Sequence, residues 1–268
     1  GAIENGLADV VDVPGWNYKP HWYTRYHDEH PAWIMYGSET ESCVSSRGEY
    51  YLPVEREKNV TRPTLHVTSY DVSSPGWGYP PDVEFAAQDD NPFVLGEFVW
   101  TGFDYLGEPT PYKTQWPSRS SYFGIVDLCG IPKDRFYLYR SRWSQEPTLH
   151  LLPHWNWEGR EGRSVPVHCY TSFDQAELFL NGRSLGVRQK EKGDDFGRYR
   201  LIWENVPYEA GELRVVALND EGEAVTDQTV RTAGPAAGLA LSVDRDLITA
   251  DGLDLAYVTV RLVDEAGT

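Results

Sequence analysis

The feature that most constrains the fold is a change of pattern near Pro147. Before it, three short apolar runs, over residues 7–13, 33–37 and 92–100, alternate with segments of helical spacing. Strands that alternate with helices are typical of a parallel sheet. After Pro147 the apolar runs are short and are separated by turn residues, with no helical spacing between them. The sequence therefore predicts an α/β part followed by an all-β part.

The α/β part is predicted to contain three helices, over residues 23–30, 82–89 and 132–143. In the last of these, aromatic residues recur at helical intervals after a proline that suits a helix start. After the first helix, residues 49–88 are interrupted by several prolines and have a loose pattern, within which 82–89 is the one helical segment. A connection of this length in a compact domain is usually functional or mobile.

The all-β part is predicted to be a sandwich over residues 148–233. Asn181-Gly182 between apolar flanks is a strong hairpin signal, and residues 220–222 mark a second turn. Residues 234–238 are a linker, and the remaining 30 or so residues begin a further β unit too short to bury a core. We therefore expect the chain to end inside a domain. The predicted strands cover residues 149–152, 165–170, 176–180, 199–203, 212–218 and 256–262.

The composition limits the partners. With 24 basic and 41 acidic residues, the formal net charge of −17 argues against nucleic acid and anionic membranes, which need a positive surface. Ten Trp and 17 Tyr suit the faces of sugar rings. Cys43, Cys129 and Cys169 are far apart and form no CxxC pair, so we predict neither a metal site nor a disulfide framework. No run is apolar and long enough to span a bilayer, and no signal peptide is visible.

One acidic residue stands where two local patterns overlap. The apolar run over residues 33–37 ends at a glycine, and Ser38-Glu39-Thr40-Glu41 follows it. Ser38 with Glu41 three residues later fits a capping box, which would start a helix here and make Glu41 a capping acid. Alternatively, Glu39 lies at the carboxyl end of a parallel strand, where catalytic residues are found in α/β sheets. Local pattern alone favours the first interpretation.

Three motifs give the chain a family resemblance. They are Asn17-Tyr18, Gly37-Ser38-Glu39-Thr40, and residues 96–112, which read GEFVWTGFDYLGEPTPY. Together with residues 121–127 and 132–139, these motifs resemble glycoside hydrolase family 2, and most closely its bacterial beta-galactosidase branch.

The resemblance implies a multidomain fold of the α/β plus all-β class. Residues 1–147 would be the carboxyl-terminal third of a (β/α)8 TIM barrel. Residues 148–233 would be an Ig-like β-sandwich, and residues 234–268 a linker with the start of a second Ig-like domain.

The resemblance also implies roles for individual residues. Glu39 matches the nucleophile at the end of the seventh barrel strand. Asn17, at the end of the sixth strand, would face the sugar, and Tyr18 would hydrogen-bond the nucleophile. Trp100 matches the aromatic residue that floors the sugar subsite, and the bond from it to Thr101 is expected to be cis.

Other polar and aromatic residues are assigned structural roles. Asp104 and Glu108 lie past a strand end, so we expect them to hold the loop after the strand. Glu97 lies inside an apolar strand, where a carboxylate needs a partner, and a structural ion pair is expected. Trp155 and Trp157 are expected in a core or at a domain contact.

The implied activity is the retaining hydrolysis of terminal beta-galactosides by two carboxyl groups in a double displacement. It requires neither a cofactor nor a metal. The family's acid/base is a Glu that follows an Asn, and the chain contains no such pair. We therefore expect the acid/base before residue 1, and the chain alone to be inactive.

Two alternatives remain open. The chain could be a non-catalytic carbohydrate-binding sandwich with a barrel remnant, or a relative that acts on a beta-glucuronide or beta-mannoside. The sequence does not decide the sugar, the linkage or whether a homo-oligomer forms. A periplasmic or extracellular location is slightly favoured over a cytoplasmic one.

Overall fold

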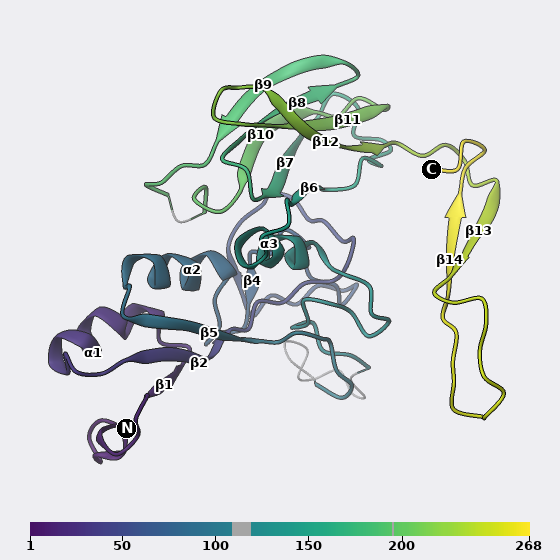
Figure 1. Cartoon of the computed structure of the whole chain (residues 1–268). Coiled ribbons are helices and arrows are strands. Elements are labelled where there is room, and N and C mark those ends of the chain that lie inside the picture. The colour runs from purple at the N-terminus through teal and green to yellow at the C-terminus, as the bar shows by residue number, and fades with distance from the viewer. Residues whose placement is uncertain (109–118, 195) are drawn as a thin grey trace.

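The computed structural model describes residues 1–108, 119–194 and 196–268. The end of the 96–112 motif, from Pro109 to Tyr112, lies outside the described residues. Figure 1 shows helices only in the first part of the described chain, with two layered sheets after them and an isolated hairpin at the C-terminus. The change of pattern near Pro147 is therefore confirmed as a change of architecture.

The first part is built on a parallel three-stranded sheet. Its order is β1 (Gly15–Asn17), β2 (Met35–Glu41) and β5 (Val94–Trp100). Helix α1 (Tyr23–Glu29) connects the first two strands, and α2 (Pro81–Asp90) precedes the third. These two helices confirm the predicted alternation, and a proline at the first helical position suits the start of α2. The carboxyl ends of the strands share one edge.

Two local predictions in this part are wrong. Residues 7–13 form no strand: a 3-10 helix covers Leu7–Asp9, and Val10 and Val11 are exposed without a neighbouring strand. No helix begins at Ser38 either, because β2 continues to Glu41 and its backbone pairs with β5. Pairing with neighbouring strands overrides the local capping signal here. The short elements of this part are the 3-10 helix η2 (Pro20–Trp22) and the paired strands β3 (Glu57–Lys58) and β4 (Ser73–Ser74).

The second part is a β-sandwich of two antiparallel sheets, ordered β10-β7-β6 and β12-β11-β8-β9. Alternating side chains of both sheets enclose one core, which includes Trp155, Val167, Leu178 and Leu213. Trp155 is thus in the core, as expected. The predicted turn at Asn181-Gly182 joins β8 to β9, and both residues have positive φ, at 50° and 79°. The strands are β6 (Leu149–Leu152), β7 (Ser164–Thr171), β8 (Gln175–Leu180), β9 (Arg183–Gln189), β10 (Leu201–Pro207), β11 (Glu212–Leu218) and β12 (Ala224–Arg231).

The two parts share a second core. Helix α3 (Asp134–Trp143) lies beneath β6 and β7 in Figure 1, and its side chains pack with α2 and the sandwich. Phe85 of α2 contacts Tyr199 edge to face at 5.3 Å between ring centroids. Arg200 donates to Asp82 in an ion pair that is fully buried between the sandwich and α2. The sandwich is therefore packed onto the helices of the first part.

The C-terminal hairpin pairs β13 (Gly238–Val243) with β14 (Val258–Val263). Its apolar side chains, such as Leu239 and Leu262, are exposed on the described chain. All three cysteines are free. No described helix has the length and hydrophobicity that crossing a membrane requires.

Candidate active site

The parallel sheet brings three of the predicted site residues together at one edge. Asn17, the last residue of β1, is in register with Glu39 of β2. Trp100, the last residue of β5, is in register with Glu41, two residues after Glu39. This convergence follows from parallel pairing, because the carboxyl ends of neighbouring strands meet at the same edge.

Glu39 is partly exposed and is held by Tyr18. The Tyr18 hydroxyl donates to Glu39 Oε1, and the Tyr18 backbone N–H donates to the Glu39 carbonyl at 2.9 Å. Burial, with the hydrogen bond to Glu39 second, raises the pKa of Tyr18 far above its ordinary value. The phenol therefore stays protonated at physiological pH and acts as a permanent donor to the carboxylate. Asn17 Oδ1 accepts from Ser38 Oγ at 2.7 Å.

Trp100 lies at the end of β5 with about a third of its surface exposed, 37%. Its indole Nε1 donates to the Tyr105 hydroxyl at 3.2 Å, and the two rings meet edge to face at 5.9 Å. The Tyr105 hydroxyl in turn lies 3.5 Å from Glu108 Oε2. The peptide bond from Trp100 to Thr101 is cis, as expected. An exposed ring fixed at its edge suits stacking against an apolar ligand face.

Asp104 holds the chain after β5. Its Oδ1 accepts from the Gly124 N–H at 2.7 Å and from Ser121 Oγ at 3.1 Å, and its Oδ2 lies 2.7 Å from Lys133 Nζ. Burial lowers the pKa of Lys133 to about 8, and Asp104 opposes that change. All of these contacts are with protein groups of the segments that follow β5, and the role expected for Asp104 stays a prediction.

Two buried carboxyl groups, those of Glu41 and Glu84, and the partly buried one of Glu97 lie close to the same strands. The prediction that Glu41 is a capping acid is wrong: it is the last residue of β2, it is fully buried, and no helix begins beside it. Glu97 forms no ion pair among the described residues; it accepts from Thr40 Oγ1 at 2.6 Å instead. Glu84 of α2 accepts from the Tyr23 hydroxyl at 2.8 Å. Burial is the main reason that the pKa of each of these three carboxyl groups is raised, for Glu84 to about 7.

Sequence reasoning missed the residues that surround Tyr18 from the other side. Ser42 Oγ lies 2.8 Å from the Tyr18 hydroxyl, and the Trp77 side chain lies near the same phenol. The Tyr79 hydroxyl donates to the Tyr18 carbonyl at 3.3 Å, and its ring meets His21 edge to face. The signal for Trp77 and Tyr79 was the long proline-rich connection, whose length indicated function without indicating which residues act. No group of three or more metal-ligating side chains occurs in the described ranges.

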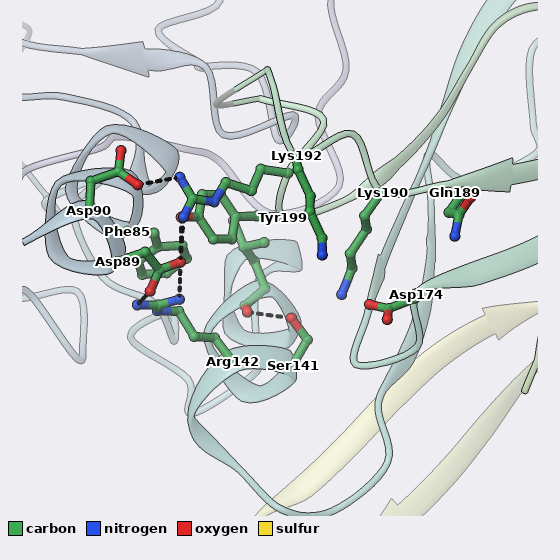
Figure 2. Close-up of a pocket in the computed structure, with 12 residues that line it drawn as sticks. Phe85, Asp89, Asp90, Ser141, Arg142, Asp174, Gln189, Lys190, Lys192 and Tyr199 are labelled. Atoms are coloured by element: carbon green, nitrogen blue, oxygen red, sulfur yellow. Dashed lines mark hydrogen bonds and ion pairs between the residues drawn. The ribbon is translucent and has the colours of Figure 1, made fainter. Parts of the chain in front are cut away.

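A separate cavity of about 690 Å³ lies between α2, α3 and the connection from β9 to β10. Figure 2 shows Arg142 against Asp89, at 2.7 Å, while Lys190 and Lys192 extend into the space beside them. Burial lowers the pKa of Lys190. No predicted site residue is among the described residues that line this cavity.

Comparisons with known proteins cover nearly the whole chain. Beta-galactosidase BoGH2A of Bacteroides ovatus is 40% identical over an alignment of 269 positions, which covers 97% of this chain and 30% of that protein. A protein named putative beta-glucuronidase of Formosa agariphila is 36% identical over 181 residues, 66% of this chain and 17% of that protein. The chain therefore spans less than a third of the length of these curated relatives. The family described as domain of unknown function DUF4982 matches residues 162–226.

Solved structures of glycosidases share the fold of this chain. A beta-glycosidase from Bacteroides vulgatus superposes with a TM-score of 0.80 at 25% identity, covering 99% of this chain and 39% of that one. A glycosyl hydrolase family 2 member from Bacteroides cellulosilyticus has a TM-score of 0.70 at 30% identity, covering 98% of this chain and 31% of that one. The relative positions of sheet, helices and sandwich are thus shared with these proteins.

Proposed function

Because this chain belongs to glycoside hydrolase family 2, we propose that it carries the nucleophile of a retaining glycosidase that cleaves terminal beta-galactosides. Glu39 is that nucleophile. The observation that supports it most is the placement of Glu39 at the carboxyl edge of a parallel sheet, with Tyr18 donating to one of its oxygens. A carboxylate anchored through one oxygen presents the other for attack.

The reaction proceeds in two displacements. Glu39 Oε2 attacks the anomeric carbon and forms a glycosyl ester while an acid protonates the leaving oxygen. Water then attacks the ester, the same second group acts as base, and the Glu39 carboxylate is released. Tyr18 stays protonated through both steps and donates to Oε1. Trp100 provides an exposed aromatic face against which the sugar ring stacks.

A retaining mechanism needs a second carboxyl group at about 5–5.5 Å from the first. We propose that a segment outside residues 1–268 supplies it, together with the remaining strands of a (β/α)8 barrel of which residues 1–147 form the last third. Residues 148–233 are then an Ig-like domain, and residues 234–268 begin another. On this proposal the chain alone does not turn over a glycoside.

Galactoside is proposed as the substrate because the relative that matches 97% of this chain carries the name beta-galactosidase. A beta-glucuronide is the second candidate, since several relatives are named beta-glucuronidases. A purely carbohydrate-binding sandwich is less favoured. Its core residue Tyr170 and its buried Arg200 both bond to residues that precede α3, which suits a support for the sheet.

The test uses the polypeptide that contains this chain and its acid/base segment. A 2-deoxy-2-fluoro-galactosyl fluoride should trap the ester, and peptide mass spectrometry should find the sugar on Glu39. Glu39→Gln should lose both the label and about three orders of magnitude or more in kcat. Glu221→Gln, an exposed acid in the turn after β11, is the matched control and should change neither. Near-normal turnover by Glu39→Gln contradicts the proposal. If only the corresponding glucuronyl fluoride labels the enzyme, the substrate is the second candidate, a beta-glucuronide.

A further inference from the structure

The Tyr18 phenol oxygen contacts Glu39 and Ser42, and their chemistry fixes the direction of both hydrogen bonds. A phenol has one proton and two lone pairs. Its proton goes to Glu39, because an ionised carboxylate can only accept. Ser42 must then donate across its 2.8 Å contact. The Trp77 side chain lies near the same phenol, and its indole can only donate.

With Ser42 donating to the phenol, the phenol proton is left to point toward Glu39. We propose that Ser42 is a positioning residue that commits the Tyr18 proton to Glu39 Oε1 and so leaves Oε2 for attack, and that the donor-only indole of Trp77 near the phenol supports the same direction. This inference rests on the proposed function, since it concerns how the nucleophile is presented. Neither residue belongs to the motifs by which the sequence resembles its family.

The backbone at the end of β2 explains why Ser42 reaches Tyr18. Glu41 and Ser42 both have positive φ, at 66° and 55°, and the Ser42 N–H donates to the Thr40 carbonyl at 2.9 Å. Two successive residues in the left-handed region reverse the chain immediately after the strand. Ser42, almost fully buried, is thereby turned back toward the residue that follows β1.

The segment that carries Trp77 is fixed to this same reversal. The Tyr79 N–H donates to the Glu41 carbonyl at 2.6 Å, and Ser74 Oγ donates to the Gly78 carbonyl at 3.1 Å. A Cβ on Gly78 would lie 2.4 Å from the Glu41 carbonyl oxygen, so this close approach requires glycine. Trp77 is therefore placed between anchored neighbours although 43% of its surface is exposed.

A double-mutant cycle separates positioning from general support of the fold. In the polypeptide with its acid/base, Ser42→Ala and Trp77→Phe should each lower kcat for p-nitrophenyl β-galactoside by about 3- to 10-fold, the range of one hydrogen bond. KM should stay within about twofold, because the loss concerns the reacting carboxylate. In a Tyr18→Phe background, both substitutions should have almost no further effect.

Ser45→Ala is the matched control, because Ser45 Oγ is buried and has no hydrogen-bond partner in the structure. Its kcat should be unchanged. The inference is overturned if Ser42→Ala and Trp77→Phe leave kcat unchanged. It is also overturned if their effects on kcat multiply with the effect of Tyr18→Phe. If Ser42→Ala does not fold, the more exposed Trp77→Phe decides alone. If Glu39→Gln is inactive and the effects multiply, only the positioning role is refuted. If Glu39→Gln is active, the proposed function itself is refuted.

Discussion

The buried carboxyl group of Glu84 should make the protein less stable as the pH rises. Glu84 is inaccessible to solvent; its Oε1 accepts from Tyr23 and Gln88, and its Oε2 has no partner. Burial first, and the charge of Glu97 second, raise its pKa from 4.5 to about 7. The folded state therefore binds a proton that the unfolded state has released across this interval.

The sign and the size follow from linkage. A raised folded-state pKa contributes stability that is fully present below pH 4.5 and is lost as the pH rises through about 7. At 1.36 kcal/mol for each pKa unit, the rise in the pKa of Glu84 from 4.5 to about 7 lowers the free energy of unfolding by about 3 kcal/mol by pH 8. Glu84→Gln keeps an oxygen that can accept from Tyr23, and it removes the charge. We expect the variant to match the wild type near pH 4.5 and to exceed it by about 3 kcal/mol at pH 8.

Thermal unfolding of both proteins between pH 4.5 and 8 measures this difference. The Tm of Glu84→Gln minus that of the wild type should grow from about zero to roughly 5–10 °C. Glu221→Gln removes an exposed carboxylate from the turn after β11 and should give a constant difference. A Tm difference for Glu84→Gln that does not change with pH, or that shrinks as the pH rises, refutes the reasoning.

Three further results are expected. Arg200→Met leaves Asp82 charged and buried without its partner, and should lower the free energy of unfolding by about 3–5 kcal/mol in urea titrations. Gly78→Ala forces a Cβ against the Glu41 carbonyl and should cost about 1–3 kcal/mol by the same assay. Tyr18→Phe should lower kcat of the complete enzyme by at least 10-fold, because a charge-assisted hydrogen bond to Glu39 is lost. For each variant, a measured effect smaller than half of the expected one contradicts the explanation given for that variant.

The sequence predicted those elements whose signal is local and strong. Helix α3 has helical periodicity, and the turn at Asn181-Gly182 needs residues that tolerate positive φ. Neither signal depends on contacts with segments distant in sequence. The placement of Asn17, Glu39 and Trp100 at strand ends was expected from the family resemblance, and parallel pairing brings these ends to one edge.

Other features depend on contacts that local sequence does not encode. The helix expected at Ser38 fails because β5 pairs with residues up to Glu41 and extends the strand. Glu41, which the local pattern made a capping acid, is buried by segments distant in sequence. Trp77 was beyond prediction for a similar reason. Its role depends on the approach of Gly78 to a carbonyl some 37 residues earlier in the sequence.

The sandwich also contributes to the arrangement of the candidate active site, although it carries none of the site residues. Arg200 holds Asp82 in the first turn of α2, and α2 begins two residues after Tyr79. Tyr79 is bonded to the Glu41 and Tyr18 backbones, and so the position of α2 limits where Trp77 can lie. Since this path consists of buried or anchored groups, a shift of the sandwich against α2 would be transmitted to the phenol that holds Glu39. The β-sandwich that follows the sheet in the chain is thus a structural support of the candidate active site at the edge of the sheet.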